Sequence, residues 1–186
     1  MISGMVAQYG HPILRDFQYE VTEREFKRIR SSQKRDRNHD VTLYVGHDDR
    51  LIVIAKHFYP PGLYRAPSGG IMPGESFHEG ISREVDEELG CQIGLRHFLL
   101  RTEVEFTRGS DRIFWRSFVF LADYVSGGFD FTDHDEIKEV REVRLDEFET
   151  FGRIMRSTDI GGLHYRADLH EAVVKARDDQ GILTSW

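Results

Sequence analysis

The sequence predicts an α/β fold in which a mixed β-sheet lies between layers of helices. Two pairs of runs rich in β-branched and aromatic residues predict most of the sheet, and a well-delimited amphipathic helix separates the two pairs. Helical patterns toward both ends of the chain predict the outer layers. With 186 residues, of which 39% are hydrophobic and 12% aromatic, the chain can bury one core, which excludes wholesale disorder and a two-enzyme chain.

Residues 1–38 are expected to form a helical extension ahead of a main domain at 39–186. Thr22 and Glu25 match a capping box, which predicts a short helix that ends near Arg30. This helix and the residues after it are dense in positive charge. The charge is typical of a solvated helix face, and a basic binding surface is the alternative.

The main domain begins with a predicted hairpin and a long loop. Val41 to Val45 and Leu51 to Ala55 are β-branched runs, and the short polar segment 46–50 joins them as a turn. Segment 58–74 then holds four Pro and four Gly among 17 residues, too many for a regular element. We therefore expect a long, shaped loop there.

The helix that follows this loop is marked at both ends. Ser76 and Glu79 form a second capping box, and Gly90 occupies the position where a helix stops. The remaining elements follow in order: strands at 95–106, 113–125 and 140–145, a helix capped by Asp146, and a terminal helix at 168–177.

Charge and cysteine content narrow the classes of function. The 25 Lys and Arg residues against 32 Asp and Glu give a net charge of −7, which argues against nonspecific nucleic-acid binding. A single cysteine, Cys91, cannot form an intramolecular disulfide, so we expect a reducing, cytoplasmic location. The first residues lack a signal-peptide pattern, and no apolar run reaches membrane-spanning length, so no membrane partner is expected.

Three glutamates on the central helix indicate a metal site. On a helical wheel Glu88 falls inside the apolar stripe that contains Val85, whereas Glu84 and Glu87 adjoin this stripe. Burying like charges costs several kcal/mol unless a cation compensates them, and Arg83 points to the outer side of the wheel. Hard carboxylate ligands favour Mg²⁺ or Mn²⁺. The alternative is a solvated acidic face without a ligand.

The wider spacing around these glutamates resembles the Nudix box, G-x5-E-x7-R-E-U-x-E-E-x-G-U, where U is aliphatic. The invariant positions are occupied by Gly69, Glu75, Arg83, Glu84, Glu87, Glu88 and Gly90, and Val85 occupies the first aliphatic position. All seven invariant positions match, which chance would produce on the order of 10⁻⁵ times per chain. Only Cys91, at the final aliphatic position, departs from the pattern, and a buried cysteine packs as a small hydrophobe.

The resemblance implies a Nudix-type α/β/α sandwich with a mixed β-sheet and a loop-helix-loop metal site. It implies hydrolysis of a pyrophosphate bond in a nucleoside diphosphate-linked molecule, by water attack at phosphorus with Mg²⁺ or Mn²⁺. The family's metal ligands carry over to Glu84, Glu87 and Glu88, and to the backbone carbonyl of Ser68, where glycine is more common. Arg83 and Glu75 carry over as an ion pair that orients Glu84 and does not itself bind the metal.

The resemblance leaves the catalytic base and the substrate open. Glu84 is the first expectation for the base, and Glu136 and Glu139 match a later segment where many Nudix proteins carry an acid. No signature of a known substrate subfamily follows the box. The candidates for substrate binding are Tyr64, Phe106 and Trp115, with Phe58 and Tyr59, for stacking on a base, and Arg65 and Arg112, with Arg108 and Arg116, for phosphates.

Two other functions stay open at this stage. A Nudix-fold sensor would bind a nucleotide without turnover, but such relatives commonly lose box glutamates, and this chain keeps all three. An RNA 5′-end pyrophosphohydrolase conflicts with the acidic total, although the basic segment 24–37 favours it. The N-terminal extension and family habit also lead us to expect a homodimer.

Overall fold

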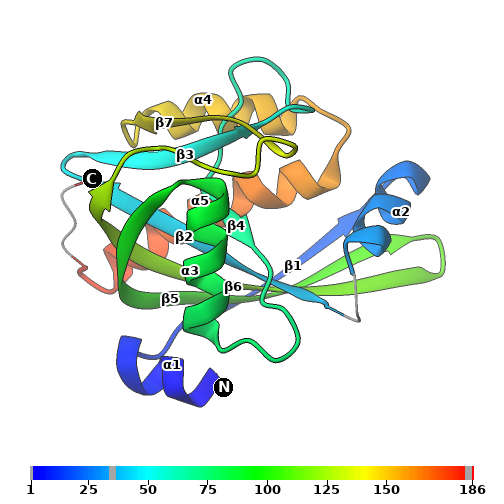
Figure 1. The fold of residues 1–186 in the computed structure, drawn as a ribbon. Coiled ribbons are helices and arrows are strands. Elements are labelled where there is room, and N and C mark those ends of the chain that lie inside the picture. The colour runs from blue at the N-terminus through cyan, green and yellow to red at the C-terminus, as the bar shows by residue number, and fades with distance from the viewer. Residues whose placement is uncertain (1, 34–36, 183–185) are drawn as a thin grey trace.

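The sheet combines parallel and antiparallel pairs. A computed structural model describes residues 2–33, 37–182 and 186 (Figure 1). The strands are β1 (Ile13–Glu20), β2 (His39–His47), β3 (Arg50–Lys56), β4 (Ser68–Gly69), β5 (Cys91–Arg108), β6 (Asp111–Gly127) and β7 (Ile137–Val143). Their order is β1-β5-β6-β2-β3-β7, with β4 paired to β2. The β1–β5 and β2–β6 pairs are parallel, and the other pairs are antiparallel.

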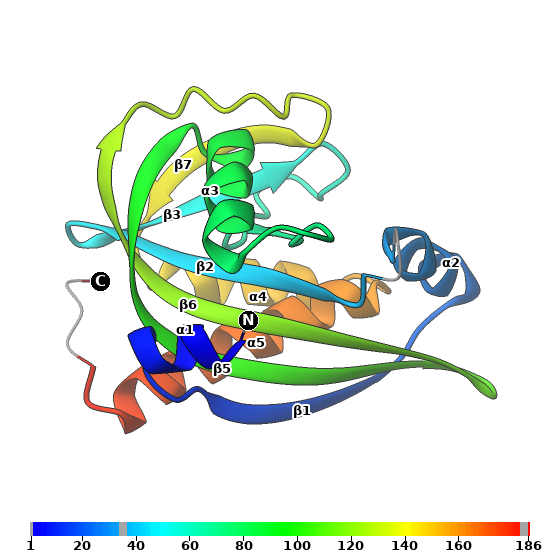
Figure 2. The same cartoon turned by 60° about the horizontal axis from the view of Figure 1, so that its bottom comes forward.

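Helices cover both faces of this sheet. They are α1 (Ile2–Tyr9), α2 (Glu23–Ser32), α3 (Phe77–Glu88), α4 (Glu147–Arg156) and α5 (Gly161–Asp179). In Figure 2, α1 and α3 lie in front of the sheet, and α4 and α5 lie behind it. The expected α/β/α arrangement around a mixed sheet is therefore confirmed. No helix in the described part of the chain is both long and apolar enough to span a membrane.

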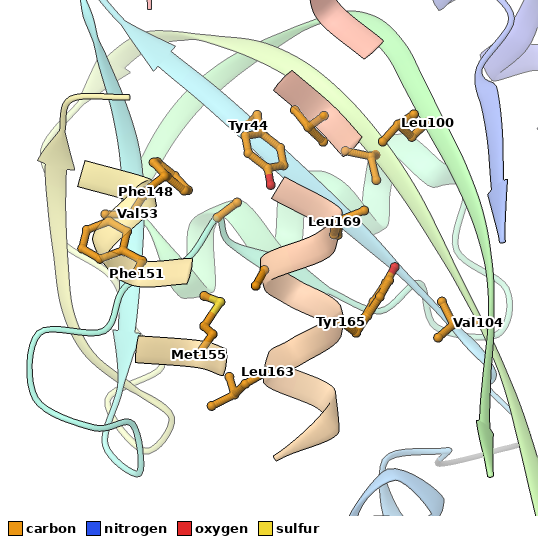
Figure 3. Packing of buried hydrophobic residues seen from close by; sticks show 14 of the residues in the cluster. Tyr44, Val53, Leu100, Val104, Phe148, Phe151, Met155, Leu163, Tyr165 and Leu169 are labelled. Carbon is orange, nitrogen blue, oxygen red and sulfur yellow. The ribbon is translucent and has the colours of Figure 1, made fainter. Parts of the chain in front are cut away.

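Alternation along the central strands separates two cores. Leu43 and Val45 of β2 pack with α3, whereas Tyr44 between them packs with α4 and α5. Figure 3 shows the second core, in which Tyr44 and Phe148 lie near Leu169 of α5. Because strands buried on both faces read as continuous apolar runs, this packing explains why β2 and β3 stand out in the sequence.

Most predicted elements are present, with shifted ends. The hairpin is confirmed as β2–β3, and the two long strands extend beyond their predicted ends to form β5 and β6. The last predicted strand begins earlier, at Ile137. Asp146 does occupy the N-cap of α4, but its side chain makes no capping hydrogen bond there.

Residues 1–38 contain a strand as well as helices, which the sequence analysis missed. In β1, Ile13 and Phe17 face the core, but exposed Leu14 and inward Arg15 obscure the alternation. The strand joins the sheet by parallel pairing with β5, a contact that no local pattern reveals.

The terminal helix begins at Gly161 rather than at Asp168. Its first turn is capped from a distance, because the Glu25 carboxylate of α2 accepts hydrogen bonds from Gly161 N at 2.9 Å and Gly162 N at 3.2 Å. Two adjacent glycines predict a loop, and the residue that caps them lies 136 positions earlier. This cap brings the start of α5 next to α2.

Candidate active site

Helix α3 is held against the sheet by its apolar stripe and begins with a complete capping box. The Ser76 side chain accepts a hydrogen bond from Glu79 N, and the Glu79 side chain accepts one from Ser76 N. Phe77, Ile81 and Val85 are buried against β2 and β3. The helix therefore presents its glutamates at a fixed rotation toward the loop that contains β4.

Arg83 and Glu75 form a two-point ion pair at the start of the site. Arg83 Nε and Nη2 donate to the two Glu75 oxygens at 2.8 and 3.0 Å, and this pairing lowers the pKa of Glu75 to about 2. Arg83 Nη1 also donates to Glu84 at 2.9 Å and to Glu87 at 3.0 Å. Arg83 has no hydrogen bond to Glu88, so it compensates only part of the acidic cluster, as the helical wheel predicts.

Glu84 and Glu88 bind backbone amides of the preceding loop. Gly70 N donates to Glu84 Oε1 at 3.0 Å, and Ser68 N donates to Glu88 Oε2 at 2.9 Å. A methyl group on Gly69 would overlap the Glu84 carboxyl group, so this glycine is needed for close approach. Glu88 is only 4% exposed, as the wheel predicts, and burial raises its pKa to about 7. Burial also raises the pKa of Glu84.

Lys56 is a member of the site that the sequence analysis missed. Its Nζ lies 3.6 Å from Glu88 Oε1 and forms an ion pair with Glu136. The lysine follows an apolar strand at its end, a common place for a solvated residue, so no local signal marks it. Lys56 thus links the buried glutamate of α3 to the segment before β7.

Of the two candidate bases in the later segment, Glu136 lies in the site and Glu139 lies outside it. Thr132 N and Asp133 N donate to the Glu87 carbonyl at 3.0 and 2.9 Å, which ties this segment to the end of α3. Glu136 and Asp133 line the same cavity as the box glutamates. Glu139 instead accepts a hydrogen bond from the Tyr64 hydroxyl at 2.8 Å.

The glutamates open into a cavity of about 560 Å³. One side of it is formed by the box loop and α3, and the other by α2, Trp115 of β6 and the start of α5. Arg65 and Arg166 lie at the boundary between the two sides, and both donate to Ser68 Oγ, at 2.9 and 3.1 Å. Arg166 also pairs with Asp40 at 2.6 Å.

Three of the predicted substrate residues do not reach this cavity. Phe106 is a correction, because it is buried in the core between Tyr19 and Tyr165. Tyr64 is engaged with Glu139 and packs on Phe151, and Arg112 pairs with Glu105 at 3.0 Å. Two further alternatives, Arg108 and Arg116, pair with carboxylates elsewhere. Arg65, Trp115, Phe58 and Tyr59 do line the cavity.

The donor set suits a hard divalent cation. Within the described ranges, no three His, Cys, Asp or Glu side chains converge as a ready-made metal cage. Glu84, Glu87 and Glu88 nevertheless line one cavity together with Ser68, and Arg83 and Lys56 offset part of their charge. A buried carboxylate whose pKa is raised gains most from a nearby cation, and its oxygens match the preference of Mg²⁺ and Mn²⁺.

Comparisons with known proteins agree with this geometry. A family model described as NUDIX domain matches residues 34–158. Nucleoside triphosphatase NudI of Salmonella arizonae is 30% identical over 98 residues, which cover 49% of this chain and 68% of that protein. The NAD-capped RNA hydrolase NUDT12 of Macaca fascicularis is 36% identical over 56 residues, covering 29% of this chain but only 12% of that protein. The crystal structure of UDP-X diphosphatase has a similar fold, with a TM-score of 0.52 and 14% identity over 96% of this chain and 78% of that one.

Proposed function

Because the chain belongs to the Nudix hydrolase family, whose members act on acid anhydrides, we propose that it cleaves the pyrophosphate bond of a nucleoside diphosphate-linked small molecule. The reaction is attack of water at phosphorus, with Mg²⁺ or Mn²⁺ as cofactor. One observation carries the proposal: Glu84, Glu87 and Glu88 line a single cavity beside the Arg83–Glu75 ion pair.

Glu84, Glu87 and Glu88, with the Ser68 carbonyl, would hold the metal. When bound, a divalent cation neutralises charge on the phosphoryl oxygens and lowers the pKa of bound water. The support for Glu88 is its burial, because an ionised carboxylate in that position needs a cation. Lys56 provides part of that compensation when no metal is present.

Arg83 and Glu75 are proposed as positioning residues. The two-point pair fixes the guanidinium plane, so that Nη1 reaches Glu84 and Nη2 reaches the Gly70 carbonyl at 2.9 Å. Arg83 thereby connects α3 to the box loop beside the glutamates. This connection should keep the glutamate side chains in the orientation that the reaction requires.

Glu84 is the proposed base, and Glu136 is the competing one. Burial raises the pKa of Glu84, which makes its carboxylate a stronger proton acceptor. Glu136 is supported by its position in the cavity and its pairing with Lys56. Glu139 is not included, because Tyr64 engages it outside the cavity. The pH–rate profile of Glu136→Gln distinguishes the two, since its acidic limb disappears if Glu136 is the base and remains if Glu84 is the base.

The substrate's base and sugar are proposed to bind the half of the cavity opposite the glutamates. Trp115 and Tyr59 offer ring faces there, and Arg65 offers a buried guanidinium. The single cysteine, Cys91, is buried, which supports a reducing, cytoplasmic compartment. The homodimer stays a proposal that sedimentation equilibrium tests.

The deciding experiment is product analysis with Mg²⁺ and a panel of nucleoside triphosphates, nucleotide sugars, dinucleotides and coenzyme A. Glu84→Gln should lose turnover by orders of magnitude. Asp86→Asn is the matched control, because Asp86 lies on the exposed side of the same helix and outside the cavity. If no compound is cleaved but one raises the melting temperature, the chain is a nucleotide sensor and the hydrolase proposal fails.

A further inference from the structure

About a third of the residues that line the cavity come from segments outside the region that matches the family. The family model covers residues 34–158, whereas α2 ends at Ser32 and α5 begins at Gly161. Both helices nevertheless line the cavity that holds the box glutamates. Arg28 of α2 and Arg166 of α5 thus lie outside the matched region, whereas Arg37 and Arg65 lie inside it.

Helix α2 is fixed in its place by α5. The buried Glu25 carboxylate accepts the first two amides of α5, as described above. A methyl group on Gly161 would lie 2.7 Å from Val21 Cγ1, so the two segments approach as closely as glycine permits. This attachment fixes α2 against the start of α5, and both helices line the cavity.

Two arginines on this side of the cavity, Arg28 and Arg37, form no ion pair with a carboxylate in the described part of the chain. The box cations Arg83 and Lys56 pair with glutamates, and Arg166 pairs with Asp40. Arg65 is buried, and its positive charge opposes the rise in the pKa of Glu88. Arg28 instead lies over the Phe58 ring at 3.7 Å.

Arg37 is the most informative of these arginines. Its guanidinium lies directly on Gly70, where a methyl group would overlap it. Its Nε is buried without any hydrogen-bond acceptor in the described part of the chain, and Nη2 only approaches the Ser32 carbonyl at 3.5 Å. A buried Nε–H without an acceptor costs free energy, and an anion bound there would supply the missing acceptor. The same Gly70 donates to Glu84, so this anion would lie within one residue of the glutamate cluster.

We propose that Arg28 and Arg37 form a second anion subsite, which binds a phosphate of the substrate beyond the two that flank the cleaved bond. The inference rests on the proposed function, since it names the substrate class for the same site. The metal would compensate charge of a diphosphate bound at the glutamates, where Arg83 and Lys56 are already paired with carboxylates. Two further guanidinium groups suit an additional phosphate, as in a nucleoside triphosphate or a dinucleoside polyphosphate, rather than a neutral sugar.

The test compares two ligands that differ only in the third group. An α,β-methylene nucleoside triphosphate carries a phosphate where the matching α,β-methylene nucleoside diphosphate ribose carries a neutral sugar. Affinities are measured by calorimetry with Mg²⁺ for adenine, guanine, cytosine and uracil, using the wild type, Arg37→Ala and Arg37→Lys. Arg24→Ala is the control, because Arg24 lies on the exposed side of α2 and outside the cavity.

Arg37→Ala should weaken the triphosphate about 10- to 100-fold and the sugar ligand less than about 3-fold. Arg37→Lys should keep part of the affinity, and Arg24→Ala should keep all of it. Equal weakening of both ligands, no weakening of either, or no binding for any base overturns the proposal. Turnover of the natural triphosphates and sugars is assayed in parallel. Absent turnover with the differential binding intact refutes the hydrolase proposal and supports the subsite.

Discussion

Replacing Glu88 by glutamine should make the metal-free protein more stable and the enzyme inactive. Glu88 is buried, accepts a hydrogen bond from Ser68 N, and has Lys56 Nζ at 3.6 Å as its nearest ion-pair partner. Burial dominates over these contacts and raises its pKa from 4.5 to about 7. The ionised carboxylate is therefore a cost to folding until a stronger cation arrives.

The size of this cost follows from the pKa shift. At 1.36 kcal/mol per pH unit, the difference between 4.5 and about 7 corresponds to about 3 kcal/mol. The folded chain holds a proton that the unfolded chain releases between these values, so stability falls as the pH rises through this window. Above this window, Glu88→Gln should be about 1–3 kcal/mol more stable than the wild type without metal, because the neutral amide does not carry the cost of the buried charge.

The assay is urea denaturation at pH 8, in a chelator and in saturating Mg²⁺. The wild type should gain stability from Mg²⁺ by mass action, and Glu88→Gln should gain much less. Asp86→Asn serves as the control for a charge removed from the exposed side of the same helix. The reasoning is refuted if Glu88→Gln is no more stable than the wild type in chelator, or if Mg²⁺ stabilises both equally.

Three further changes have expected outcomes. Burial lowers the pKa of His170 to about 4, so charging this imidazole should cost the folded state about 2 kcal/mol between pH 7.5 and 4.5, and His170→Phe should gain that amount relative to the wild type in urea denaturation. Glu25→Ala leaves the Gly161 amide without its acceptor and should cost about 2 kcal/mol, measured by thermal denaturation. Gly69→Ala should displace the Glu84 carboxylate and lower kcat about 100-fold.

Each change has a matched control or a contradicting result. Glu23→Ala removes an exposed carboxylate from the same helix as Glu25 and should leave the stability nearly unchanged. Gly4→Ala adds a methyl group to α1 where nothing lies within 4 Å, so it should leave kcat unchanged. The prediction for His170 is contradicted if the difference in stability between His170→Phe and the wild type does not grow as the pH falls from 7.5 to 4.5.

The chemistry of α3 is predictable from the sequence because every feature involved is local. The capping box at Ser76 spans three residues, and the burial of Glu88 follows from helical spacing alone. Lys56 and Arg37 join the site only through the tertiary fold. Each is an ordinary polar residue in its own segment, and only the packing of β3 and α2 around the loop brings it to the glutamates.

The pairing of charges within the cavity explains why the arginines proposed to bind a second phosphate come from outside α3. On the α3 side every cation is already engaged by a carboxylate, so that side has no unpaired positive charge to offer a second phosphate. The guanidinium groups that bind this second phosphate have to come from another segment, α2 and Arg37 after it. Glu25 holds α2 in place through its hydrogen bonds to α5. The contact between Glu25 and the start of α5 should therefore contribute both to stability and to substrate affinity. Glu25→Ala should weaken the triphosphate analogue more than the sugar ligand even below its melting temperature, whereas Glu23→Ala should leave both affinities unchanged.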